Sequence, residues 1–273
     1  MRSRRPQDQC IVLACDAAYA APTAVAIRSV LVSTPSAPDV VVIQRGLDRG
    51  QIELLCAESD TVRVVSAPED FQLGSGVSKL SAHVSSAMFY KLLTPNLVPA
   101  AVERALYLDS DTIVRQSVTD VFEADMSSNL LAAADDRYLD GGHLSRENPR
   151  QRYFNSGVVL YDIPACRRVS LTDVLIDYVQ RRSDDLEFPD QDALNVIASD
   201  CRAVLPSKWN CMLGEDIKSS SAAVQQREIA QAAILHYVGP TKPCNEGFPA
   251  GPLRQAYLHY ARARPEPDRG ATG

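Results

Sequence analysis

Residues 104–115 read Arg-Ala-Leu-Tyr-Leu-Asp-Ser-Asp-Thr-Ile-Val-Arg, and this stretch decides both the fold and the chemistry expected of the chain. The apolar run 105–108 and the β-branched run 112–114 are typical of strands in a sheet that is covered on both faces. In an extended backbone, residues i and i+2 point to the same side. We therefore expect Asp109 and Asp111 to aim two carboxylates at one point at a strand end. Such a pair suits a hard divalent cation, which could in turn hold a diphosphate.

The Asp-Ser-Asp triplet has an alternative interpretation as a turn or a helix cap, because Asp and Ser are favoured in both. The residues that follow, Thr112, Ile113 and Val114, form a poor first helical turn, since β-branched side chains lose rotamer freedom in a helix. The triplet alone leaves both interpretations open. Residues further along the chain favour the metal site.

The composition is that of an ordinary soluble globular protein. A chain of 273 residues suits one large domain or two small ones, and 45% hydrophobic with 23% charged residues permits a substantial core. The net charge of −6 implies no general affinity for nucleic acid. The seven cysteines are scattered, odd in number and without a Cys-x-x-Cys pair, which argues against a disulfide framework or a thiolate zinc site and favours a reducing compartment.

Both ends of the chain are expected to be flexible. Residues 1–9 are basic, and their arginines could touch an anionic membrane surface or simply be disordered. The apolar run 10–15 is too short for a secretory signal, and no stretch approaches the roughly 20 apolar residues of a membrane span. We therefore expect a cytoplasmic protein with one domain over 10–250, followed by a helix and a disordered tail over 251–273.

The first elements predict an α/β fold. Residues 10–15 are expected to form a buried strand, and a helical pattern with Ala24, Ile27 and Val30 on one face follows it. Ligands of α/β folds collect beyond the carboxyl ends of strands, where Asp16 and Tyr19 lie. Asp16 could accept hydrogen bonds from a base or ribose and Tyr19 could stack on a base; a helix cap and a packing residue are the alternatives.

Further elements follow from the same patterns. Strands are expected at 40–43, 61–65, 130–134, 158–161 and 232–237, and helices at 51–57, 81–93, 171–181, 188–199 and 253–263. The helix at 81–93 should end before Pro95, and its Lys91 is either a C-terminal cation or a phosphate contact. Residues 137–152 are polar and irregular, which is typical of a mobile lid, and 153–157 should form a turn.

Three polar residues late in the chain have both a structural and a functional interpretation. Asp190 occupies a position expected of a helix N-cap, whereas Gln191 beside it has no capping role. His236 ends an apolar strand, so it is either a hydrogen-bonded core residue or a ligand. Lys242 follows it in a Gly/Pro loop, and an imidazole ligand with a cation that reaches phosphate is a plausible functional pair.

Five ordered motifs resemble the family 8 glycosyltransferases, retaining nucleotide-sugar transferases related to bacterial lipopolysaccharide galactosyl- and glucosyltransferases and to glycogenin. The resemblance covers residues 11–243, most of the chain. The motifs are Ala14-Cys-Asp16 with Tyr19, Leu106-Tyr-Leu-Asp-Ser-Asp-Thr112, Phe154-Asn-Ser-Gly-Val158, Asp190-Gln-Asp-Ala-Leu-Asn195 and His236-Tyr-Val-Gly-Pro-Thr-Lys-Pro243.

The resemblance implies a GT-A fold, a single Rossmann-like α/β domain with a mixed sheet flanked by helices, and a UDP-sugar donor with Mn²⁺ or Mg²⁺. By matching position, the metal ligands would be Asp109, Asp111 and His236. The other donor-binding residues implied are Ala14, Asp16 and Tyr19 for uridine, Gly239 and Lys242 for the diphosphate, and Lys91 and Asn155 for the sugar, together with Ser110 between the two aspartates. The catalytic residues implied are Gln191, Asp190 and Asp136, which would surround the sugar and favour an oxocarbenium-like state.

The expected activity is transfer of a hexose, from UDP-galactose or UDP-glucose, to an unidentified hydroxyl on a cell-surface glycan, a natural product or a protein. A nucleotide-sugar hydrolase or nucleotidyltransferase, and a non-catalytic nucleotide-sugar-binding protein, are the alternatives. Three positions depart from the family pattern. This chain has Ala18 where the family often has asparagine, Lys91 where it usually has arginine, and Cys244 where it commonly has tryptophan. These departures leave the donor preference and the acceptor open.

Overall fold

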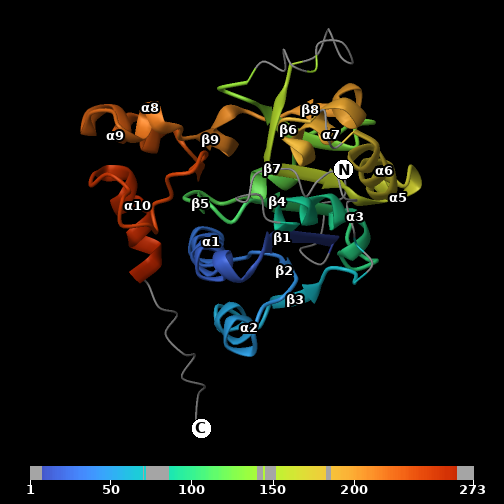
Figure 1. The fold of residues 1–273 in the computed structure, drawn as a ribbon, viewed down its shortest axis with the longest axis horizontal. Coiled ribbons are helices and arrows are strands. Elements are labelled where there is room, and N and C mark those ends of the chain that lie inside the picture. Colours follow the sequence, from blue (N-terminus) through green and yellow to red (C-terminus); the bar gives the residue numbers. More distant parts are fainter. Residues whose placement is uncertain are drawn as a thin grey trace.

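The computed structural model describes residues 8–69, 71, 86–139, 144, 152–182 and 186–262 (Figure 1). Its strands are β1 (Gln9–Cys15), β2 (Asp39–Gln44), β3 (Val62–Ser66), β4 (Arg104–Leu108), β5 (Thr112–Val114), β6 (Leu131–Asp135), β7 (Phe154–Asp162), β8 (Arg202–Val204), β9 (Cys211–Met212) and β10 (Ile234–His236). Its α-helices are α1 (Ala20–Ser33), α2 (Arg49–Cys56), α3 (Thr94–Leu97), α4 (Thr119–Phe122), α5 (Ile163–Arg168), α6 (Leu171–Arg182), α7 (Pro189–Ala198), α8 (Glu215–Lys218), α9 (Ala222–Gln231) and α10 (Pro252–Arg262). The 3₁₀ helices are η2 (Ala17–Tyr19), η4 (Ser86–Leu93), η6 (Ser199–Cys201) and η7 (Ser207–Asn210).

The main sheet has seven strands in the order β3-β2-β1-β4-β7-β6-β8. Six of them run parallel, and β7 alone runs antiparallel to its neighbours β4 and β6. Helices cover this sheet, so the expected α/β architecture with a mixed sheet is confirmed. Among the described residues, no helix is long and apolar enough to cross a membrane.

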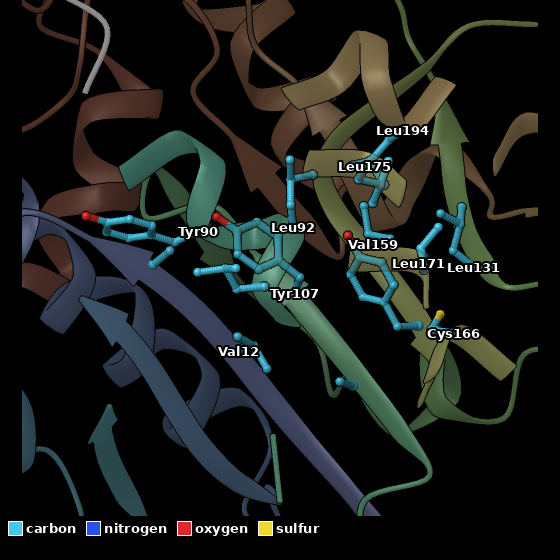
Figure 2. Close-up of a cluster of buried hydrophobic side chains, with 14 of the residues drawn as sticks. Val12, Tyr90, Leu92, Tyr107, Leu131, Val159, Cys166, Leu171, Leu175 and Leu194 are labelled. Atoms are coloured by element: carbon cyan, nitrogen blue, oxygen red, sulfur yellow. The ribbon is translucent and has the colours of Figure 1, made fainter. Parts of the chain in front are cut away.

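The central strands β1, β2 and β4 are largely apolar because both faces of the sheet are covered there. On one face, Val12, Tyr107 and Val159 pack against η4, α6 and α7 (Figure 2). On the other face, the alternate residues of the same strands, Ile11 and Leu106 among them, pack against α1, α2 and α4. The sheet thus lies in the middle of a three-layer core, and its carboxyl edge is free for a ligand.

A second, three-stranded sheet has the order β5-β10-β9. Its core includes Ile113, Leu235 and Tyr237, which pack with residues of α8, α9 and α10. Figure 1 shows these three helices grouped on the side away from α5, α6 and α7. The chain passes from the main sheet to this second sheet through the three residues between β4 and β5.

Those three residues, 109–111, form a turn and not the extended segment expected from the sequence. The backbone N–H and the hydroxyl of Thr112 both bond to the carbonyl of Asp109, at 3.1 and 2.7 Å. The turn is needed because β4 and β5 belong to different sheets. Asp109 and Asp111 are therefore brought together by a turn. The expectation that they converge because alternate residues of an extended strand point to the same side is wrong.

A bulge between β6 and β7 shapes the other side of the same edge. Ala133 pairs with Val159, so a regular ladder would pair Asp135 with Gly157, yet Asp135 pairs with Phe154. Residues 155–157 are thereby released from pairing with β6, as is common where a bulge lies beside a site. The expected turn at 153–157 is wrong, because residues 154–157 belong to the start of β7.

Several other expectations need correction. The described part of the helix expected at 81–93 is the 3₁₀ helix η4, and α3 continues beyond it with Pro95 in its first turn, where a missing N–H costs nothing. Phe188 is the N-cap of α7, so Asp190 lies inside the helix and does not cap it. Most of the predicted lid at 137–152 lies outside the described residues.

The remaining elements agree with the patterns within a few residues, with β2, β3, α2, α6 and α10 at the expected places. β1 begins at Gln9, one residue after the described part of the chain begins. The flexible start and the tail lie largely outside the described residues. The division of the chain into 1–9, 10–250 and 251–273 stays a prediction.

Candidate active site

A cavity of about 960 Å³ lies beyond the carboxyl ends of β1 and β4, where the two sheets meet. Every site residue predicted from the sequence lines it. These residues are Ala14, Asp16, Tyr19, Lys91, Asp109, Ser110, Asp111, Asp136, Asn155, Asp190, Gln191, His236, Gly239 and Lys242. Residues from most of the length of the chain therefore share one cavity.

Asp109, Asp111 and His236 form a cluster in this cavity. One ligand atom of each lies within 4.8 Å of the others. His236 Nε2 is 3.2 Å from Asp111 Oδ1 and 3.8 Å from Asp109 Oδ2. Strand pairing explains the convergence, because β10 pairs with β5 so that His236 stands opposite Thr112.

The chemistry of the cluster fits a divalent cation. His236 Nδ1 lies 2.9 Å from the side-chain oxygen of Asn210, which can only accept, so in the neutral ring Nδ1 carries the proton and Nε2 presents a lone pair. That lone pair faces Asp111 Oδ1, which is buried and has no hydrogen-bond partner among the described residues. Two acceptors held this close repel each other unless a cation is shared. Two carboxylate oxygens and one imidazole nitrogen suit Mn²⁺ or Mg²⁺, whereas a zinc site built from thiolates would need cysteines.

Gly157 of β7 lies directly beneath this cluster. A Cβ at this position would stand 2.2 Å from His236 Cε1 and 2.7 Å from Asp109 Oδ2, both far inside normal contact. Its carbonyl also accepts a 2.8 Å bond from the Asp109 N–H. Only glycine permits the strand to approach the two ligands so closely.

Lys91 is a buried cation that joins two carboxylates. Its ammonium bonds to Asp190 at 2.8 Å, Asp109 at 3.1 Å and the Ser156 hydroxyl at 3.1 Å. Burial opposes its charge, but Asp109 and Asp190 raise the pKa of Lys91 above its ordinary value. Burial raises the pKa of Asp190 despite the lysine beside it. The Tyr107 hydroxyl, which the sequence did not single out, donates a 2.9 Å bond to Asp109.

A network of amides surrounds Gln191. Its side-chain oxygen accepts from Asn155 Nδ2 at 3.1 Å and from the Ser156 N–H at 2.9 Å. Asp136 Oδ2 accepts from Asn155 at 3.2 Å and from Gln191 Nε2 at 3.3 Å. Asp136 Oδ1 accepts from the Tyr138 N–H at 2.8 Å. The three residues expected to be catalytic are therefore held in fixed positions by the bulged strand and its neighbours.

Asn210 is a site residue that sequence reasoning missed. It is buried, and besides its contact with His236 its Nδ2 donates a 2.9 Å bond to Asn155 Oδ1. It thus links the metal-ligand cluster to the amide network and fixes the histidine ring, as outer-shell partners of metal ligands do. A single asparagine after Trp209 carries no periodic or motif signal that would have revealed this role.

The residues expected to bind uridine lie at the end of β1. Asp16 Oδ1 caps η2 by accepting from the Tyr19 N–H at 3.1 Å, so the helix-cap interpretation of Asp16 is correct for that oxygen. The Ser110 hydroxyl is engaged within the protein: it donates to the Ala14 carbonyl at 2.8 Å and accepts from Thr23 at 2.7 Å. Ser110 therefore ties the Asp109–Asp111 turn to β1 and α1.

Lys242 approaches the cluster from the loop after β10. Its ammonium bonds to Asp111 Oδ2 at 2.5 Å and to the Tyr237 carbonyl at 2.7 Å. Burial opposes ionisation of Asp111, but the Lys242 ammonium beside it holds the pKa of that carboxyl well below its usual range. Gly239 in the same loop has φ +82°, a left-handed conformation that favours glycine. The loop thus brings one cation to the edge of the cavity.

Comparison with known proteins gives one consistent result. Residues 10–246 match the sequence profile of glycosyl transferase family 8. General stress protein A of Bacillus subtilis (strain 168) is 28% identical over 193 residues, 66% of each chain. Glycosyltransferase GlyF of Streptococcus pneumoniae serotype 4 (strain ATCC BAA-334 / TIGR4) is 27% identical over 252 residues, 92% of this chain and 60% of that protein. The chain thus spans about two thirds or less of these relatives' length.

Among solved structures, that of the galactosyltransferase LgtC in complex with donor and acceptor sugar analogs resembles the chain with a TM-score of 0.78 at 23% identity. The match covers 95% of this chain and 98% of that one. At this level of identity the likeness shows the fold, a GT-A arrangement with a mixed sheet.

Proposed function

This chain belongs to glycosyl transferase family 8, and on that premise we propose that it transfers a hexose from a UDP-sugar to an acceptor hydroxyl with retention of anomeric configuration. UDP-galactose and UDP-glucose are the proposed donors, and Mn²⁺, or Mg²⁺, is the proposed cofactor. The observation that carries the proposal is the unpartnered Asp111 oxygen facing the lone pair of His236 inside the cavity. The scattered, odd set of cysteines favours action in the cytoplasm.

The proposed donor lies across the cavity. Uridine would be held by Ala14, Asp16 and Tyr19, and the diphosphate by Gly239 and Lys242. Asp109, Asp111 and His236 would hold the cation, which when bound offsets the negative charge that develops on the β-phosphate as UDP leaves. These assignments are supported by the order of the residues around one cavity.

The sugar would lie among Lys91, Asp136, Asn155, Asp190 and Gln191. Carboxylates close to an oxocarbenium-like centre lower its energy by electrostatic attraction. The Lys91 ammonium already bonds to Asp109, Asp190 and Ser156, so we propose that it holds these groups in place more than it binds the sugar. A lysine makes this three-way contact as a point charge, without the bidentate geometry of arginine.

The hydrogen bonds of the candidate nucleophiles favour a front-face attack without a covalent intermediate. The Gln191 side-chain oxygen already accepts two hydrogen bonds, and both Asp136 oxygens accept bonds from neighbours. Asp190 is buried beside Lys91. All three side chains already make hydrogen bonds or an ion pair within the protein, and we propose that the departing phosphate accepts the proton of the acceptor hydroxyl. Isolation of a glycosyl adduct on any of the three would refute this route.

A donor screen tests the proposed function. Purified protein with Mn²⁺ is incubated with a panel of UDP-sugars, and UDP release is followed with and without candidate acceptors. We expect UDP release with at least one UDP-hexose, stimulated by an acceptor. Asp111→Ala should abolish turnover and weaken UDP binding while the far-ultraviolet circular dichroism is unchanged.

The matched control is Asp120→Ala, which removes an exposed aspartate in α4 that does not line the cavity. It should behave as the wild type. Full activity of Asp111→Ala would exclude the metal assignment. UDP release that no acceptor stimulates would favour a hydrolase, and UDP binding without turnover would favour a binding protein.

A further inference from the structure

Lys218, the last residue of α8, is a buried cation that has no part in the site as described so far. Only 1% of its side chain is exposed. Its ammonium donates to the carbonyl of Val238 at 2.5 Å, to the carbonyl of Thr241 at 2.8 Å and to Glu215 Oε1 at 2.9 Å. An ammonium has three N–H donors, so all of them are used within the protein.

Two of those acceptors belong to the loop that carries the proposed diphosphate contacts. Residues 237–241 connect His236, the last residue of β10, to Lys242, and Gly239 lies between the two carbonyls. A Cβ on Gly239 would stand 3.8 Å from Lys218 Nζ. The loop is therefore wrapped around the ammonium, with its carbonyls turned toward α8.

Turning the carbonyls inward decides what the loop presents to the cavity. Gly239 and Lys242 both line the cavity, whereas Lys218 does not. The N–H of Gly239 has no hydrogen-bond partner in the part of the chain that the structure describes. Because an internal cation holds the carbonyls of Val238 and Thr241, the loop leaves the Gly239 N–H, and not these two carbonyl oxygens, for an anion, which is the polarity that a diphosphate requires.

Removing the Lys218 ammonium from water costs free energy, and this cost indicates that the buried charge has a function. Burial lowers the pKa of Lys218, and the hydrogen bond that its ammonium donates to Glu215 opposes that effect. A lysine that only stabilised the fold would be replaced at little cost by an apolar residue, because buried charges seldom add net stability. An ammonium specifies one loop conformation, which an apolar side chain does not.

We propose that Lys218 is the positioning residue for the diphosphate of the nucleotide-sugar. It holds Gly239 and Lys242 where they bind the diphosphate, and it does not touch the ligand. The inference rests on the proposed function, since it requires that the ligand be a nucleoside diphosphate.

The test compares UDP with uridine, because the loop concerns only the diphosphate. The dissociation constants of both ligands are measured by calorimetry in the presence of Mn²⁺ for the wild type, Lys218→Met and Lys208→Met. Lys208 is the matched control, an exposed lysine whose ammonium stacks on the Trp209 ring. We expect Lys218→Met to weaken UDP binding roughly tenfold or more while uridine binding changes less than about twofold. Lys208→Met should change neither.

A purely structural role would weaken both ligands alike or neither, so an unchanged ratio of UDP to uridine affinity in Lys218→Met would overturn the proposal. If that variant does not fold, Gly239→Ala provides the second test. It strains the left-handed backbone and places a Cβ 3.3 Å from Glu215 Oε1 without removing the Lys218 ammonium, so it should weaken UDP and spare uridine. Equal affinity of Gly239→Ala and wild type for UDP would also overturn the proposal.

The two proposals fail in different ways. If the wild type binds no UDP, the proposed function fails and the role of Lys218 fails with it. If the wild type binds UDP and transfers sugar, and Lys218→Met does so with the same affinities, only the role of Lys218 is refuted.

Discussion

Gly157→Ala tests the geometry of the proposed metal site without changing a ligand. The added Cβ would stand 2.2 Å from His236 Cε1, and an ordinary contact begins at 3.4 Å, so ring and strand must separate by about 1.2 Å. Overpacking of this kind costs about 1–3 kcal/mol of stability. The same displacement breaks the 2.9 Å contact between His236 and Asn210 that orients the ring. A misplacement of about 1 Å typically costs on the order of 100-fold in activity.

The assay has two parts. Mn²⁺ affinity is measured by calorimetry on the protein alone, and sugar transfer is measured by UDP release with the donor found in the screen. We expect weaker Mn²⁺ binding and about 100-fold slower transfer, with a modest loss of thermal stability. The control is Gly247→Ala, where a Cβ meets no atom within 4 Å, and it should match the wild type in all three measurements. Wild-type Mn²⁺ affinity in Gly157→Ala would refute the placement of the metal beside His236.

Three further predictions concern the neighbours of the site. Asn210→Leu leaves His236 without its orienting acceptor, so Mn²⁺ affinity should fall about 10- to 100-fold, and an unchanged titration would contradict the role. Lys91→Met leaves Asp109 and Asp190 without their buried counter-charge, so urea unfolding should show a loss of about 3–5 kcal/mol; a loss below about 1 kcal/mol would contradict it. Burial opposes ionisation of Asp135, but Arg202 and Arg152 beside it lower the pKa of this carboxyl below 3.8. The ionised carboxylate therefore stabilises the fold above pH 3.8, and this stabilisation is lost as the pH falls through the lowered pKa. Asp135→Asn should therefore be less stable than the wild type by about 1–2 kcal/mol at pH 7, with the difference shrinking toward pH 3; a difference that does not depend on pH would refute the assignment.

Local patterns predicted much of this molecule. The apolar runs that became β1, β2, β4 and β6 were readable because a strand covered on both faces must be apolar along its length. The ordered motifs predicted the family and the residues that line the cavity, since each motif lies at or close to the end of an element that reaches the carboxyl edge of the sheet. These strands and motifs could be predicted because they depend only on residues that are neighbours in the chain.

The segments whose conformation was predicted wrongly are those that depend on partners far away in the sequence. Residues 109–111 form a turn because β5 pairs with β10 and not with the main sheet. Residues 154–157 belong to β7, because Phe154 pairs with Asp135 of β6 and a bulge releases only residues 155–157 from that strand. Neither pairing leaves a mark in the local sequence.

The sequence by itself determined which elements form and which polar side chains lie at their ends, because burial and backbone preference act over a few residues. Tertiary structure alone decided that His236 meets Asp111, that Asn210 orients the histidine, and that Lys218 holds the loop after β10. Each of these contacts joins separate elements, and its free energy depends on desolvation and hydrogen bonding that exist only after the chain has folded.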